Sequence, residues 1–220
     1  MAQIFKPSVD TFARLVLVAA VLFFVGVILL GPLAARSAYQ SKVGWVVPQP
    51  VPFSHQHHVS GLGIDCRFCH ATVETSAHAG FPSTHVCMTC HSQVWTGSPM
   101  LAPVRKSLAS GTPMVWNRVS KLPDYVFFNH SIHIDRGVAC VTCHGRVDTM
   151  PLLARAKPFE MRFCLECHRD PAPHLGPAGR ITQMTPVGWD EATHRRFALA
   201  AARRYQLDPS RLDKCDICHR

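Results

Sequence analysis

The chain has 220 residues, ten cysteines, fourteen histidines and a formal net charge of +9. This length allows one sizeable domain plus an anchor and excludes a second enzyme domain. Charged residues make up 17% of the chain and apolar residues 47%. A skew of this kind indicates a membrane segment, a cofactor-filled interior, or both.

The first predicted element is an uncharged apolar run over residues 15–35, between Arg14 and Arg36. As a helix the run would be about 31 Å long, and the hydrocarbon core of a bilayer is about 30 Å thick. We therefore expect one transmembrane helix over 15–35, a cytoplasmic segment over 1–14 and a linker over 36–52.

A cleaved signal peptide is the alternative interpretation of this run. Lys6 and Arg14 would form its basic start, and the small residues at 33–35 resemble a cleavage site. The apolar run is long for a signal peptide, which favours a retained anchor.

All ten cysteines belong to five CxxCH motifs. Two thiols one helical turn apart can add to the two vinyl groups of one haem, and the adjacent imidazole can bind the iron. The sequence therefore predicts five covalent c-type haems, each with a proximal histidine. The motifs are Cys66-Cys69-His70, Cys87-Cys90-His91, Cys140-Cys143-His144, Cys164-Cys167-His168 and Cys215-Cys218-His219.

Zinc knuckles and thioredoxin-like redox sites also use CxxC pairs. Structural zinc takes four ligands, usually from two CxxC pairs, so five pairs would leave one unmatched. Neither use requires the histidine that follows every pair in this chain. Covalent haem attachment is therefore the favoured interpretation.

An internal repeat groups the motifs in pairs. The first cysteines are separated by 21, 53, 24 and 51 residues, and an FxHxxH element precedes each close pair, at 53–58 and 128–133. This pattern predicts two dihaem modules, over 53–127 and 128–175, and a fifth haem within 176–220.

The FxHxxH elements supply candidates for the distal iron ligands. Histidines at positions i and i+3 of a helical turn project to the same side, so one turn can serve two neighbouring irons. We predict that His55, His58, His130 and His133 are distal ligands, and we expect His57 to face solvent.

The fifth distal ligand has several candidates. Met184 is the first choice, and Met161, Met150 and His194 are the alternatives. A methionine ligand would raise the potential of its haem above that of haems with two histidine ligands.

The last long predicted element is an amphipathic helix over 190–206, with Asp190 as its N-cap. His194 is expected to be solvated on this helix. Three further histidines are expected at the surface, namely His78, His85 and His174.

The number of residues per haem predicts the fold class. Residues 36–220 leave about 37 residues for each of five haems, too few for a conventional core. We expect a mainly α and irregular multihaem cytochrome c fold, in which short helices and loops wrap a haem-packed core and little β-sheet is present.

The positive charge does not indicate nucleic acid. Five haems carry roughly ten propionates, which need Arg and Lys nearby. The sequence has no basic stripe interleaved with aromatic residues, so no nucleic-acid partner is expected.

Charge alone does not orient the anchor, because Lys6 and Arg14 before it balance Arg36 and Lys42 after it. Covalent c-type haem attachment takes place outside the bacterial cytoplasm. We therefore expect the haem domain on the periplasmic or outer side of the cytoplasmic membrane.

Several segments together resemble one family over nearly the whole chain. They are the anchor after Gln3-Ile4-Phe5, FSHQHHVSGLGIDCRFCH, CMTCHSQVW, LPDYVFFNHSIH, CVTCHGRVDTMPL, CLECHR and CDICHR. The sequence resembles the pentahaem, membrane-anchored cytochrome c subunit of alternative complex III, a bacterial quinol oxidoreductase. The resemblance implies polytopic quinol-oxidising subunits, an iron–sulfur protein and a monohaem cytochrome c as partners, in addition to membrane lipid.

The leading functional hypothesis is an electron-transfer subunit that is not an enzyme on its own. It would relay electrons from quinol oxidation to a downstream cytochrome c or another periplasmic acceptor. The alternatives are a stand-alone, membrane-anchored quinol dehydrogenase, a multihaem reductase with an open iron site, and a free-standing storage cytochrome. The absence of a CxxCK motif counts against the reductase, and the anchor counts against a diffusing protein.

Overall fold

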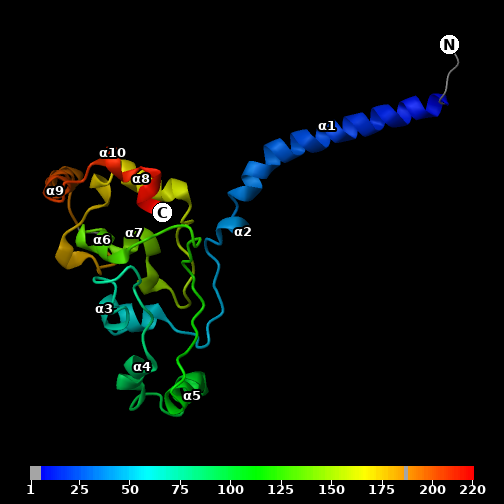
Figure 1. The fold of residues 1–220 in the computed structure, drawn as a ribbon. Helices are drawn as coiled ribbons and strands as arrows, with labels where there is room; N and C mark the ends of the chain where they lie inside the picture. Colours follow the sequence, from blue (N-terminus) through cyan, green and yellow to red (C-terminus); the bar gives the residue numbers. More distant parts are fainter. Residues whose placement is uncertain (1–5, 186–187) are drawn as a thin grey trace. The chain divides into compact units, whose positions relative to one another are not determined.

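The computed structural model describes residues 6–185 and 188–220, and it divides the chain into two compact units, Met1–Lys42 and Val43–Arg220. Figure 1 shows the long helix of the first unit and the short helices of the second. We describe each unit by itself.

The first unit consists of α1 (Pro7–Ala35) and the short helix α2 (Ala38–Ser41). Helix α1 begins eight residues before the predicted position. A proline is favourable at the first position of a helix because its missing N–H would have no intrahelical partner, and an ion pair between Asp10 and Arg14 (2.9 Å) spans the next turn. The helix is long and apolar enough to cross a membrane, as the sequence predicted, although its polar start extends it beyond the apolar run.

The second unit is built from short helices and irregular segments. Its described residues form no strand and contain only three isolated β-bridges. This confirms the prediction of a helical and irregular fold with little β-sheet. The helices are η1 (a π-helical turn, Gln56–Gly61), α3 (Cys66–Cys69), α4 (Thr84–His91), η2 (Pro99–Leu101), α5 (Ala102–Ser110), α6 (His130–Asp135), α7 (Cys140–His144), η3 (Val147–Thr149), α8 (Met161–Arg169), η4 (Ala172–His174), η5 (Ala178–Arg180), α9 (Glu191–Arg204), α10 (Pro209–Leu212) and α11 (Cys215–Cys218).

Apolar residues of the second unit gather in small clusters rather than in one core. The described residues form three of them, centred on Leu101 and Val104, on Ile134 and Ile181, and on Leu175. Single domains of this size usually have one contiguous core. The clusters thus support the expectation that the protein alone does not fill its interior.

Helix α9 matches the predicted amphipathic helix, and its N-cap prediction is confirmed. The Asp190 carboxylate accepts a hydrogen bond from the Thr193 N–H at 2.9 Å. Ala198 and Ala201 are buried, and Ala201 belongs to the Leu175 cluster, whereas the arginines of the helix are exposed. The prediction that His194 is solvated is wrong. This residue is half-buried, and its Nε2 lies 3.2 Å from the Leu175 carbonyl oxygen.

Candidate haem-binding sites

Each CxxC pair lies on its own short helix. The pairs occupy α3, α4, α7, α8 and α11, and the histidine of each motif lies at or just after the end of the helix. None of the ten cysteines takes part in a disulfide. One helical turn therefore brings the two thiols of every motif to the same side, as thioether attachment to one haem requires.

Three predicted distal histidines face a proximal histidine. The ring centroids are 6.2 Å apart for His58 and His91, 6.4 Å for His130 and His144, and 6.1 Å for His133 and His168. A metal–imidazole bond is about 2 Å long, so two imidazoles on one metal ion have centroids about 6 Å apart. The three pairs fit a six-coordinate haem iron, which takes only two ligands from the protein.

Backbone carbonyls fix the orientation of most of these rings. A carbonyl oxygen only accepts, so an Nδ1 beside it carries the proton and Nε2 keeps a free lone pair for a metal. Seven of the nine predicted histidine ligands have such a contact, at 2.7 to 3.1 Å. These are His58 to Ser54, His70 to Gly80, His91 to Val94, His130 to Ala77, His133 to Asn129, His168 to Leu212 and His219 to Tyr125.

Burial keeps several of these imidazoles neutral. Desolvation, with smaller effects from neighbouring histidines, lowers the pKa of His55 to about 4 and that of His144 to about 4. Desolvation also lowers the pKa values of His130 and His133. Only the neutral imidazole binds a metal ion, so these residues are ready to act as ligands near neutral pH.

His55 differs from the other distal candidates. No ring contact between it and a proximal histidine is present among the described residues. The three facing pairs leave His70 as the remaining proximal histidine of the first four motifs.

The fifth motif lacks a facing imidazole among the described residues. The His219 ring instead stacks on Tyr125, with centroids 5.8 Å apart, and the Phe127 N–H donates to the Cys218 carbonyl at 2.8 Å. The segment around Tyr125 thus covers one side of this motif. Tyr125 was not identified from the sequence, and its place before the second FxHxxH element gave no signal of this contact.

The methionine candidates differ in burial. Met184 is only 6% exposed, Met161 is 67% exposed at the start of α8, and Met150 is half-buried. Met184 follows Thr182, whose hydroxyl donates to Asp65 beside the first motif at 2.9 Å. Its burial favours Met184 over the other two methionines as an iron ligand. The hydrogen bond of Thr182, however, places this segment beside the first motif rather than the fifth.

The motifs follow one another in a continuous order. The turn that carries His55 and His58 joins the first and second motifs, and the turn that carries His130 and His133 joins the third and fourth. The first and third motifs are held together by residues 181 and 182: the Cys140 N–H donates to the Ile181 carbonyl (2.9 Å), and the Cys66 thiol lies 3.8 Å from the Thr182 carbonyl.

The fifth motif adjoins the fourth. His168 contacts the Leu212 carbonyl, and Arg169 lies 3.4 Å from Asp213, just before the fifth motif. The resulting order is second, first, third, fourth, fifth. Figure 1 agrees, because α4 lies at one end of the unit and α8 and α10 at the other.

The two FxHxxH elements make matching contacts. Phe53 stacks on His58 (4.3 Å between centroids), and Phe128 stacks on His133 (4.6 Å). Each element also forms a backbone hydrogen bond with a loop of the other module. The partner loop follows the third motif for the first element and the first motif for the second element. The Gln56 N–H donates to Met150 (3.1 Å), and the Ser131 N–H donates to Ser76 (3.2 Å).

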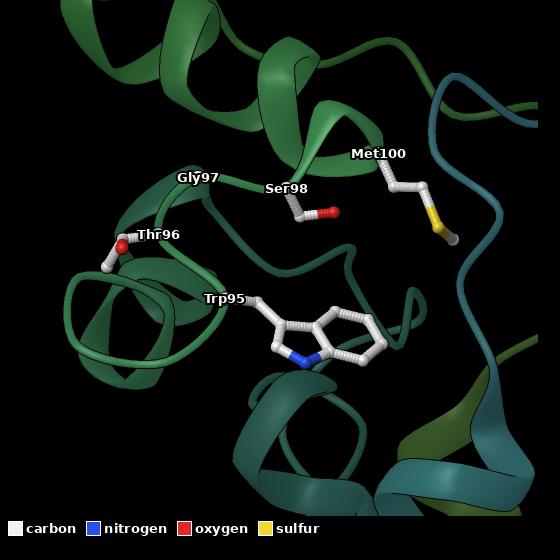
Figure 2. Close-up of a pocket in the computed structure, with 5 residues that line it drawn as sticks. All are labelled: Trp95, Thr96, Gly97, Ser98 and Met100. Atoms are coloured by element: carbon white, nitrogen blue, oxygen red, sulfur yellow. The ribbon is translucent and has the colours of Figure 1, made fainter.

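An open pocket of about 460 Å³ lies beside the second motif, lined by Trp95, Thr96, Gly97, Ser98 and Met100. Figure 2 shows the Trp95 indole and the Met100 side chain at its edges, with the Ser98 hydroxyl directed between them. The exposed His57 stacks on Trp95 at 6.3 Å. The prediction that His57 faces solvent is confirmed, and its partner Trp95 was not identified from the sequence.

Three other histidine predictions have a clear outcome. His78 and His85 are exposed, as expected, whereas His174 is half-buried in η4. Within the described residues, no three His, Cys, Asp or Glu side chains converge into a site for a bare metal ion.

The chain is similar to one curated protein of known name. It is 36% identical over 125 residues to the menaquinone reductase, multiheme cytochrome c subunit, of Nitratidesulfovibrio vulgaris. The match covers 56% of this chain, and the chain spans about half (53%) of the length of that relative. No protein-family model matches the sequence. The similarity agrees with the sequence-based resemblance at the level of a multihaem cytochrome c subunit and does not distinguish alternative complex III.

Proposed function

We propose that this chain is an electron-transfer subunit of a membrane quinol oxidoreductase and carries five c-type haems. The observation that carries the proposal is the set of three facing imidazole pairs, 6.1 to 6.4 Å apart, each formed between an FxHxxH turn and a CxxCH motif. Two protein ligands on opposite sides of an iron leave no coordination position for a substrate. The chain is therefore a relay rather than an enzyme on its own.

The chain's own residues would hold the haems as follows. The ten cysteines form thioethers, and the five motif histidines are the proximal ligands. The proposed distal ligands are His55 for the first motif, His58 for the second, His130 for the third and His133 for the fourth. For the fifth motif, Met184 is carried forward as the first choice from the sequence, and the titration described below tests it. When bound, the haems supply reversible one-electron transfer along the order of the motifs.

The proposed setting follows from the resemblance and from the similar subunit. The relative's name connects a multihaem cytochrome subunit with menaquinone, and the sequence resembles alternative complex III. We propose polytopic quinol-oxidising subunits, an iron–sulfur protein and a monohaem cytochrome c as partners. Helix α1 would anchor the chain, with the modules at 53–127 and 128–175 and the fifth haem on the periplasmic side.

Haem content tests the cofactor part of the proposal. The intact mass of the protein from an expression host with c-type haem maturation should exceed the sequence mass by five haems, and a pyridine haemochrome assay should give the same ratio. Four or fewer haems in a folded, fully processed chain would contradict the count of five.

The assembly is tested separately on gently solubilised native membranes. A native gel stained for haem, with peptide mass spectrometry of the band, should place this chain with polytopic subunits and an iron–sulfur protein. A small band that contains only this cytochrome would contradict the role as a complex subunit.

Methionine ligation of the fifth haem has its own test. Met184→Ala should remove one high-potential step from a redox titration, with Met161→Ala as the matched control. If the Met184→Ala titration is unchanged and the Met161→Ala step is lost, the ligand is Met161.

A stand-alone quinol dehydrogenase is the second candidate function, and the pocket at Trp95 favours it. Its volume lies within the range of about 300 to 1,000 Å³ that is usual for small-molecule sites. It also lies at the second motif, one end of the haem order. Quinol oxidation by the purified single chain that is lost in Trp95→Ala would support this function, and its absence would exclude it.

A further inference from the structure

Helix α9 presents a basic face that has no acidic partner in the described part of the chain. Among the described residues, none of its arginines forms an ion pair with a carboxylate, unlike the arginines beside the motifs, such as Arg67 and Arg169. Their other side-chain contacts are with uncharged partners, the Thr193 hydroxyl and the Tyr205 ring. The one acidic residue of the helix is Glu191, in its first turn. The α9 arginine face consists of four exposed residues, Arg195, Arg196, Arg203 and Arg204.

The period of the helix directs this face away from the apolar side of α9. Ala198 and Ala201 are buried, whereas Leu199 is 44% exposed. At about 3.6 residues per turn, Arg196 and Arg203 lie on the side of Leu199, opposite the two alanines. The other two arginines flank this line. The α9 arginine face therefore points away from the cluster that joins α9 to its own unit.

Helix α9 lies beside the last two sites in the order of the motifs. His194 on α9 contacts the carbonyl of Leu175, directly after η4, which follows the fourth motif. The chain passes from α9 into α10, where the Leu212 carbonyl contacts His168 of the fourth motif at 2.7 Å, and then reaches Cys215 of the fifth. Figure 1 shows α9 and α10 at the same end of the unit as α8. The basic face thus lies at one end of the proposed relay.

The chemistry of this face fits a protein with an acidic surface. Opposite charges steer two proteins into a productive encounter and raise the rate of association. A lipid surface fits less well, because a helix that lies in a membrane interface buries its apolar side among the lipids. The apolar side of α9 packs within the unit instead, and Leu199 is the large apolar side chain that the helix exposes.

We propose that the α9 arginine face is the docking surface for an electron-carrier protein with an acidic surface around its redox centre. The inference rests on the proposed function and adds the place at which an electron passes between the relay and a second protein. In this step one ferrous haem of the chain becomes ferric, and the oxidised centre of the carrier gains the electron.

The test uses the full-length, haem-loaded protein in nanodiscs that contain anionic lipid, reduced with dithionite and freed from the excess. Stopped-flow absorbance follows electron transfer to two high-potential ferric monohaem cytochromes c, one with a net negative charge and one with a net positive charge. The double variant Arg196→Glu, Arg203→Glu should slow the reduction of the acidic cytochrome by about tenfold or more at low salt and should not slow that of the basic one. The difference should disappear at 1 M salt, where the Debye length is about 3 Å.

The double variant Lys106→Glu, Arg118→Glu is the matched control, because both residues are exposed outside α9 and the change in net charge is the same. Equal slowing in the control would show that net charge alone sets the rate and would overturn the docking surface. Equal rates for the wild type and the α9 variant, as expected of a face covered by the membrane, would overturn it too. Loss of haem or a displaced redox wave in the α9 variant would assign these arginines to haem propionates, with the same consequence.

Failure of the proposed function gives a different result. A haem-loaded chain that reduces neither cytochrome at low or high salt is not a relay. Reduction of both cytochromes at rates that the wild type and the α9 variant share would overturn the docking surface alone.

Discussion

Individual imidazoles in this protein are held from two directions by contacts within the chain. A phenylalanine ring stacks on one face of His58 and of His133, and a backbone carbonyl four residues earlier fixes the Nδ1 of each. Such contacts set the orientation of a ligand and increase its affinity for a metal. The FxHxxH pattern therefore has a role for its phenylalanine as well as for its histidines.

The role of His133 can be tested by spectroscopy. Because His133 faces His168 across 6.1 Å, His133→Ala should convert one low-spin haem of the oxidised protein to high spin in the electron paramagnetic resonance spectrum. His57→Ala is the control, since this exposed residue is not part of a facing pair. An unchanged low-spin spectrum in His133→Ala would remove the ligand assignment.

The ionisation of Asp65 makes the stability of the fold depend on pH. Hydrogen bonds from Arg67 lower the pKa of this carboxyl to about 2, below its unfolded value of about 3.9. A carboxyl with a lowered pKa stabilises the fold above its unfolded pKa, and this contribution is lost as the pH falls towards the folded value. The side chain is 42% exposed, so the contribution is below about 1 kcal/mol.

Asp65→Asn should therefore lower the denaturation midpoint at pH 7, and the difference from the wild type should shrink between about pH 4 and pH 2. Asp124→Asn, at a carboxyl elsewhere in the unit, is the control. A difference that is the same at both ends of this range would show that the Asp65 charge does not contribute.

At the level of elements, the segment before the third motif and the segment after the fourth are closely packed at two glycines. Gly137 has φ +82°, and its carbonyl accepts a hydrogen bond from the Gly176 N–H at 2.8 Å. A Cβ atom at Gly137 would overlap the Gly176 carbonyl oxygen. The segment before α7 and the segment after η4 can approach this closely only because Gly137 lacks a side chain.

Gly137→Ala should lower the free energy of unfolding by about 1 to 3 kcal/mol, because it adds both a steric overlap and a strained φ. Gly179→Ala is the matched control, since its Cβ would meet no atom within 4 Å. Thermal denaturation followed by the haem absorbance measures both variants. Equal denaturation midpoints for the two variants would show that the segment between α6 and α7 can shift without loss of stability.

The sequence predicted some elements better than others. The apolar run and the Asp190 cap are local signals, and α1 and α9 follow them closely. The CxxCH and FxHxxH patterns placed the candidate ligands on short helices for the same reason. The pairing of His130 with His144, the loop contact at Ala77 and the cover that Tyr125 gives to the fifth motif depend on long-range packing, which no local pattern encodes.

On the scale of the whole molecule, the chain separates an apolar helix from a unit that is built around five motifs. Met1–Lys42 and Val43–Arg220 are separate compact units. The apolar area exposed along α1 would be buried by a bilayer. The haem-binding unit does not rely on α1 for its internal contacts.

Removal of the anchor should therefore leave the haem-binding unit intact. Residues 43–220, exported behind a cleavable signal peptide, should remain in the supernatant after ultracentrifugation without detergent and show the same haem stoichiometry and spectrum as the full chain. The full chain, as the control, should sediment with membranes. A truncated protein that loses haem would show that the first unit contributes to the fold.

The exchange of loop contacts between the modules has a consequence for how such a chain can be assembled. The Gln56 N–H of the first module donates to the Met150 carbonyl of the second. The Ser131 N–H of the second module donates to the Ser76 carbonyl of the first. Two separate copies of one dihaem module would make the same contacts across a two-fold axis. The contacts of the first four motifs thus follow the pattern of a homodimer within one chain, and half a chain on its own would leave its ligand-bearing turn without this hydrogen bond.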